Sequence, residues 1–247
     1  MLNQGRNIRR LWILLILRAT RLCGFSIVTS STLHRLILFS NSLAPTNNVL
    51  PETAKVLKNN YGPYFPDYQA EIDRLIGLGL VDIVDMRWKS DDGRFLGKYR
   101  INEAGMTFLA NAIAVLRSVA RAERAVSETV AAFADYQLDQ EAGAIAVDAN
   151  YGLDTLQAGE IVDFGEWRNS RNYATEAAQF MLHTWVSSAF KVDQVDEGEV
   201  FEPELLISSS EEVDTFASTH VRKAAVYLYA QYIHAQLKLS QSEVSYV

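Results

Sequence analysis

The sequence predicts a mainly α-helical protein with one β-hairpin, divided into an N-terminal domain over residues 1–105 and a helical domain with acidic loops over residues 106–247. Three observations predict this fold class. Hydrophobic residues make up 49% of the 247-residue chain, which is enough to bury a sizeable core. Apolar side chains recur at helical spacing in most segments. One pair of β-rich runs, on either side of residue 90, flanks a short polar turn.

The first predicted helix covers residues 7–23 and contains the apolar run LWILLIL at residues 11–17. Arginines precede this run as they precede the apolar part of a signal peptide, but Arg18 and Arg21 follow it at once and no small-residue cleavage site appears. The run is also far shorter than the ~20 residues of a transmembrane helix, so we expect a core helix and no membrane partner. Cys23 is the single cysteine, which excludes a disulfide framework and fits a reducing, cytoplasmic location.

The next two helices are predicted from apolar spacing and from their end signals. One helix covers residues 30–43, and Pro45 stops it because proline cannot continue a helix. Residues 45–63 are expected to form a loop or a broken short helix. The third helix begins at Pro66, which suits a first helical turn, and ends at Gly79, which suits a left-handed cap.

A β-hairpin is predicted directly after the third helix. A strand from Leu80, a polar turn over 89–93 and a return strand over 95–101 lead to Asn102, which is a good helix cap. This order of three helices, two strands and an exit helix resembles the winged-helix domain. The resemblance rests on the segment EIDRLIGLGLVDI…GRFLGKYRINEAG and covers roughly residues 8–110. It implies that the hairpin is a two-stranded wing.

The second half of the chain is predicted to consist of helices joined by acidic loops. An Ala-rich helical pattern covers residues 103–137, and its spacing leaves open whether the helix is continuous. The later segments are a loop over 141–168 with a short strand at 161–164, a helix over 170–190 and an acidic loop over 191–206. Ser209 and Glu212 then match a capping box that opens the terminal helix.

Charge is divided unevenly along the chain. Residues 1–124 carry a balance of +7 and residues 125–247 a balance of −14, within a net charge of −7. The basic half suggests weak, non-specific contacts to the phosphates of double-stranded DNA, and the alternative is ordinary surface charge. The candidate DNA-backbone residues lie on the wing and near the N-terminus: Arg87, Lys89, Arg94, Lys98, Arg100, Arg6, Arg9 and Arg10.

The third helix argues against sequence-specific DNA recognition. In winged-helix DNA readers this helix enters the major groove and presents basic or amide side chains. Here it carries Asp67, Glu71 and Asp73 against the single Arg74, and carboxylates are repelled by phosphates. A winged helix of this kind is more typical of protein contacts.

Four aromatic residues surround the start of the third helix: Tyr61, Tyr64, Phe65 and Tyr68. Aromatic side chains dominate the binding energy of protein interfaces, so this cluster is a candidate interface anchor. The alternative is that the segment packs on its own domain.

No catalytic motif is evident in the sequence. Phosphate-binding glycine loops, HExxH and GxSxG are all missing, and the four histidines have no metal-ligand spacing. One acidic cluster could suggest a metal-dependent nuclease: Asp148, Asp154, Glu160, Asp163 and Glu166. Residues 125–167 contain no lysine or arginine, which favours an acidic surface or a protein-docking loop. We expect no catalytic residue, cofactor or metal.

Several segments resemble the middle, accessory subunits of bacterial three-component ABC-ATPase defence systems, including the Lamassu type. They are TLHRLILFSNSLAP, YGPYFPDYQAEIDRLIGLGLV, the wing, and DANYG…GEIVDFGEWRNSRNYATEAA, spread over about residues 32–178. The resemblance implies a non-enzymatic antiviral subunit that docks on an SMC-like (structural maintenance of chromosomes) ATPase. That ATPase would sense foreign DNA and release a toxic effector subunit, often a nuclease. The alternative function is a winged-helix transcriptional regulator with a C-terminal dimerisation domain.

Overall fold

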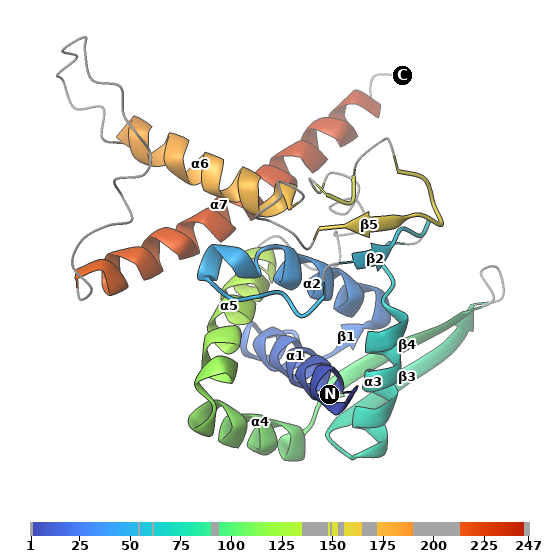
Figure 1. Ribbon diagram of the computed structural model, residues 1–247. Helices are drawn as coiled ribbons and strands as arrows, with labels where there is room; N and C mark the ends of the chain where they lie inside the picture. The colour runs from blue at the N-terminus through green and yellow to red at the C-terminus, as the bar shows by residue number, and fades with distance from the viewer. Residues whose placement is uncertain are drawn as a thin grey trace, which may run out of the picture.

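The computed structural model describes residues 2–53, 55–60, 62–89, 94–134, 148, 150–152, 156–164, 172–189 and 213–244. It is mainly helical with a small antiparallel sheet, as the sequence predicts (Figure 1). The helices are α1 (Leu2–Leu22), α2 (Ser30–Ser42), α3 (Pro66–Gly77), α4 (Glu103–Val115), α5 (Arg117–Ala134), α6 (Tyr173–Ala189), α7 (Val213–Val244) and a short 3-10 helix, η1 (Ala44–Asn47). The strands are β1 (Val28–Thr29), β2 (Lys55–Leu57), β3 (Val81–Lys89), β4 (Arg94–Ile101) and β5 (Ile161–Asp163).

Helix α1 lies at the centre of the N-terminal half and packs against α2, α3, α4 and α5. Residues 12–17 are all buried, because a helix surrounded by neighbours needs apolar residues on every side. The indole Nε1 of Trp12 donates a hydrogen bond of 3.0 Å to Ser40 Oγ on α2, so its polar atom is satisfied inside the core. Within the described residues, no helix has the length and apolar character needed to cross a membrane.

Helix α2 is capped at its start by Thr29, whose Oγ1 accepts a hydrogen bond of 3.1 Å from Thr32 N. The helix is buried along almost its whole length. It ends at Ser42, one residue before the predicted end. Pro45 lies in η1, where the first turn needs no backbone donor. The segment after α2 is therefore a broken short helix followed by β2, and the sequence did not indicate that strand.

The sheet has the strand order β1-β4-β3 and is antiparallel throughout. Strand β1 precedes α2 and pairs Val28 with Tyr99, while β3 and β4 form the predicted hairpin. Gly79 ends α3 with φ +69°, and Asn102 Oδ1 accepts from Gly105 N at 3.0 Å at the start of α4. Both end signals read from the sequence are confirmed.

The Ala-rich pattern over 103–137 forms two helices rather than one. Leu116 between α4 and α5 has extended backbone, with φ −109° and ψ 105°. The break turns the chain so that both helices pack on α1 (Figure 1). Helix α5 buries Phe133, whose ring stacks on Phe39 of α2 at a centroid distance of 4.1 Å. Packing on the core therefore decides the break.

Helices α6 and α7 pack on each other, and α7 also contacts α5 and η1. Strand β5 confirms the short strand predicted at 161–164, and it pairs with β2, for example Lys55 with Asp163. One hydrophobic cluster runs across the predicted domain boundary at residue 105 and includes Leu14, Val130 and Tyr229. The acidic loop over 191–206 and the Ser209–Glu212 capping box lie outside the described residues.

Candidate functional site

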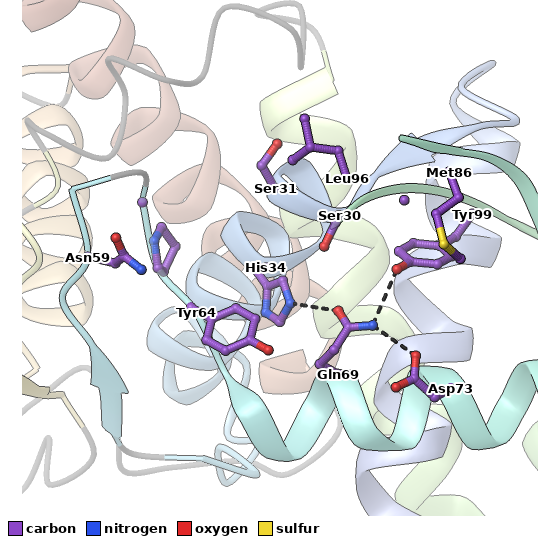
Figure 2. Close-up of a pocket in the computed structure, with 13 residues that line it drawn as sticks. Ser30, Ser31, His34, Asn59, Tyr64, Gln69, Asp73, Met86, Leu96 and Tyr99 are labelled. Atoms are coloured by element: carbon purple, nitrogen blue, oxygen red, sulfur yellow. Dashed lines mark hydrogen bonds between the residues drawn. The ribbon is translucent and has the colours of Figure 1, made fainter. Parts of the chain in front are cut away.

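A pocket of about 570 Å³ lies between the start of α2, helix α3 and the β3–β4 hairpin (Figure 2). Its polar wall is built by His34, Gln69, Asp73 and Tyr99, and Tyr64 lies beside His34. Sequence reasoning identified Tyr64 alone of these as a site residue. The others come from elements far apart in the chain, and no local motif marks them.

His34 and Gln69 hold each other in one orientation. The backbone N of Phe65 donates to His34 Nδ1 at 3.3 Å, so the ring proton is on Nε2, which donates to Gln69 Oε1 at 3.4 Å. Gln69 Nε2 in turn donates to Asp73 Oδ1 at 3.0 Å and to Tyr99 Oη at 3.3 Å. Burial lowers the pKa of His34 to about 4. The ring is neutral at pH 7 and both nitrogens are engaged, so it is poorly suited to acid–base catalysis.

The position of Tyr99 depends on Gly97. A Cβ at residue 97 would lie 2.6 Å from Tyr99 Cζ, so a larger residue would push the ring out of place. Burial raises the pKa of Tyr99, which keeps its hydroxyl protonated. Among the residues that line this pocket there is no lysine or arginine, and Asp73 is the one carboxylate. The pocket is therefore unsuited to a phosphate or another anion.

Arg9 and Arg10 of α1 are held by carboxylates of the same protein. Arg9 pairs with Glu52 and with Asp67, at 2.9 Å in each case. Arg10 Nε lies 2.6 Å from Glu71 Oε2, and Arg74 pairs with the other oxygen of Glu71. These contacts tie α1 to α3 and to the segment before β2.

The position of Glu71 corrects one sequence-based expectation. Glu71 was expected to face the phosphates together with Asp67 and Asp73, but its side chain is 2% exposed. It faces α1 because two arginines neutralise it there. Arg6, another candidate for DNA contact, is exposed on α1.

Three cations of the hairpin, Arg87, Lys98 and Arg100, also form ion pairs with carboxylates of the same hairpin. Asp85 Oδ2 lies 3.0 Å from Arg87 Nε and 3.6 Å from Lys98 Nζ. Arg100 Nη2 lies 2.9 Å from Asp82 Oδ2, and hydrogen bonds from Asn102 and Arg100 lower the pKa of Asp82. Lys89 and Arg94 face each other in the β3–β4 register, and their side chains lie outside the described part of the structure.

The four candidate interface aromatics are placed differently. Tyr64 is 37% exposed and lies 5.0 Å from the His34 ring. Phe65 stacks on His34 at 6.0 Å and is buried, as is Tyr68, whose Oη accepts from Asn41 Nδ2 at 3.5 Å. Phe65 and Tyr68 thus pack on their own domain, which is the alternative that the sequence left open. Tyr61 lies outside the described residues.

The acidic cluster does not assemble as a metal site in the described part of the chain. Asp148 is buried: its Oδ1 accepts from Asn150 N (3.0 Å) and Tyr151 N (2.7 Å), and its Oδ2 accepts from Tyr229 Oη (2.7 Å). Asp163 pairs with Lys55 at 3.5 Å, and Glu160 Oε2 accepts from Gln157 N at 2.6 Å. Asp154 and Glu166 lie outside the described residues, and the described residues contain no group of three metal-binding side chains.

Asp148 belongs to a polar junction that joins the end of α2 to the start of α6. We use this name for Ser42, Asp148, Asn150, Asn172, Thr175 and Tyr229. The carbonyl of Ser42 accepts from Asn172 Nδ2 at 2.7 Å and from Thr175 Oγ1 at 2.6 Å. Asn172 Oδ1 also caps α6 by accepting from Thr175 N at 3.1 Å, and Asn150 Oδ1 accepts from Ala174 N at 2.9 Å. The DANYG and NYAT segments therefore hold the helices together.

Comparisons with protein-family models, curated proteins and solved structures find no match for this chain.

Proposed function

We propose that the chain is a non-enzymatic, winged-helix subunit that binds protein partners within an SMC-like ATPase defence complex. The resemblance of residues 32–178 to the middle subunits of such systems supports the assignment to this class. The element order α1-β1-α2-η1-β2-α3-β3-β4, with the sheet order β1-β4-β3, supports a winged-helix domain in which η1 and β2 form an insertion between α2 and α3. The β3–β4 hairpin is then the wing.

One observation carries the preference for protein over DNA: several of the candidate DNA-contact cations are neutralised within the domain. Arg9, Arg10, Arg87 and Arg100 each pair with a carboxylate, in the contacts given above. Each of these cations would have to give up its carboxylate partner to bind a phosphate, so the gain from counterion release is reduced. Asp73 also remains exposed on α3, where it would meet phosphates unfavourably.

In this proposal the subunit bridges the ATPase and an effector, such as a nuclease. The second half, with its balance of −14, suits a basic protein surface. Any contact with double-stranded DNA is weak, does not depend on sequence, and involves the exposed cations such as Arg6.

Co-expression of the chain with the products of its neighbouring genes tests the proposal. We expect the chain to co-purify with an ATPase that contains a coiled coil, and to stay bound through gel filtration. A coiled-coil ATPase from an unrelated system serves as the control and should not be retained. A chain that elutes without any ATPase, although both proteins are soluble, contradicts the proposal.

The alternative function, a winged-helix transcriptional regulator, makes a different prediction. A regulator binds one operator sequence at about 10⁻⁸ M or tighter at physiological salt. Selection of bound duplexes from a random pool distinguishes the two functions. Enrichment of a consensus favours the regulator, and a pool that remains random favours the accessory subunit.

A further inference from the structure

Strand β3 lies at the edge of its sheet. In the order β1-β4-β3, β4 pairs with it on one side, and no described strand pairs with it on the other. The hairpin extends beyond the helices that surround α1, so no helix covers the distal part of this edge (Figure 1). An uncovered edge presents a row of backbone N–H and C=O groups that can pair with another strand.

The side chains of β3 are unusually apolar for an uncovered strand. Ile83, Val84, Met86 and Trp88 are 39%, 42%, 52% and 57% exposed. Soluble proteins commonly protect such an edge with charge or cover it, because exposed apolar strands associate. Here exposed large apolar residues occupy four of the nine positions of the strand, and Val81 is the one buried apolar residue.

The sequence of β3 is complementary to itself when two copies run antiparallel. If Met86 of one copy lies opposite Met86 of the other, Asp85 of each copy lies opposite Arg87 of its partner. The two-fold axis repeats this pair, so the contact contains two opposite-charge pairs, one on each side of the Met86–Met86 pair. Moving the register by one residue in either strand would lose the two charge pairs.

The bulge of β3 sets the length of this contact. The register with β4 shifts between Ile83 and Asp85, and it is regular from Asp85 to Lys89. A bulge bends a strand and ends regular pairing, so Val84 bounds the contact on one side, and regular pairing reaches one residue to either side of Met86. The contact is short, and we expect a dimer that forms in a concentration-dependent way.

We propose that the edge of β3 pairs antiparallel with β3 of a second copy of this chain, centred on Met86, to form a two-fold dimer. This dimer is independent of the ATPase complex proposed above. A failure of dimerisation leaves the co-purification experiment unaffected, and the reverse also holds.

Charge reversal tests the register. Asp85→Arg brings two arginines opposite each other at both ends of the contact, and Arg87→Asp brings two aspartates opposite each other at the same places. We expect each variant alone to dimerise about tenfold less tightly than the original chain, measured by sedimentation equilibrium. In an equimolar mixture of the two variants, every charge pair is again attractive, and we expect a heterodimer with the original affinity.

The mixture distinguishes a contact between two chains from an effect of the Asp85–Arg87 ion pair within one chain. Asp85 and Arg87 also pair within the same hairpin, but mixing two damaged hairpins cannot repair either one. Arg100→Asp is the matched control, because it removes a hairpin ion pair, with Asp82, that lies on the other side of the bulge from the proposed contact. It should leave dimerisation unchanged, and circular dichroism should show that all variants are folded.

Three results would overturn the proposal. The first is an original chain that stays monomeric up to about 1 mM. The second is a dimer that is unaffected by either single variant, which would place the contact on another surface or with another strand. The third is a mixture of the variants that remains monomeric.

Discussion

The polar junction and the β3–β4 hairpin both contain an aspartate that contacts polar side chains, but one aspartate is buried and the other is partly exposed. In the junction, Asp148 is fully buried, and each of its two oxygens accepts at least one hydrogen bond. In the hairpin, Asp85 is partly exposed and forms ion pairs with both Arg87 and Lys98 at the surface. A buried polar group that loses its partners pays the full cost of desolvation, whereas an exposed one turns to water. The junction charge is therefore expected to contribute more to the stability of the fold than the hairpin charges do.

The largest expected effect comes from Asp148→Ala in the junction. The change leaves Asn150 N, Tyr151 N and the Tyr229 hydroxyl without their acceptor, so we expect the free energy of unfolding to fall by about 4 kcal/mol. Asp163→Ala is the control, because Asp163 pairs loosely with the exposed Lys55 and should change stability by less than ~0.5 kcal/mol. Urea denaturation measures both. Equal effects would contradict the claim that the burial of Asp148 and its three hydrogen bonds set the cost.

The second prediction concerns buried His34. Burial lowers the pKa of His34 from 6.5 to about 4, so the unfolded chain binds the proton more readily than the folded chain. The stability from this group is complete above pH 6.5 and is lost as the pH falls towards 4, by about 3 kcal/mol in total. His34→Gln should remove this part of the pH dependence. The measurement is the difference between the two chains in urea midpoint at pH 7 and at pH 4.5.

Carboxylates such as Glu52 and Asp148 titrate in both chains, so their contribution cancels in that difference. If the two chains lose stability in parallel between pH 7 and pH 4.5, the neutral and buried state of His34 is disproved.

A third, smaller effect is expected from Tyr229→Phe. The variant removes the hydroxyl that donates to Asp148 but keeps the buried ring, so we expect a loss of about 1.5 kcal/mol in the free energy of unfolding. Tyr232 lies on the same helix and is 39% exposed, and Tyr232→Phe is the matched control. Thermal unfolding of the two variants compares them. A Tyr232→Phe variant as unstable as Tyr229→Phe would show that burial does not set the cost.

The smallest effect is expected in the hairpin. Arg87→Ala breaks the pair with Asp85, but both groups are solvated, so the free energy of unfolding should change by less than ~0.5 kcal/mol. Urea denaturation at low and at physiological salt checks this. A loss above ~1 kcal/mol would mean that the hairpin charges are structural after all.

The helices and the hairpin were predictable because their signals are local. Apolar spacing marks α1 and α2, and Gly79 and Asn102 mark the ends of neighbouring elements. Strands β1 and β2 were missed because two or three residues are too short to show alternation. The break at Leu116 was left open because leucine is a good helix former, and only packing on α1 reveals it.

The candidate site was less predictable because its partners are distant in sequence. The sequence identified Arg9 and Arg10 of α1 as basic residues that could contact DNA, but it did not reveal the carboxylates that pair with them. Their neutralising carboxylates lie 43 residues away for Arg9 and 61 for Arg10, and no local pattern joins them. In the same way, the pocket wall combines His34 of α2 with Gln69 of α3 and Tyr99 of β4. Sequence composition indicated the charges but not their pairing.

The most direct test of the central claim is a titration of the purified chain with duplex DNA, followed by fluorescence anisotropy at physiological salt. If the arginines are held by carboxylates and the surface serves protein partners, the dissociation constant should be no tighter than ~10⁻⁶ M and equal for unrelated sequences. Binding at about 10⁻⁸ M to one sequence in preference to others would contradict the account.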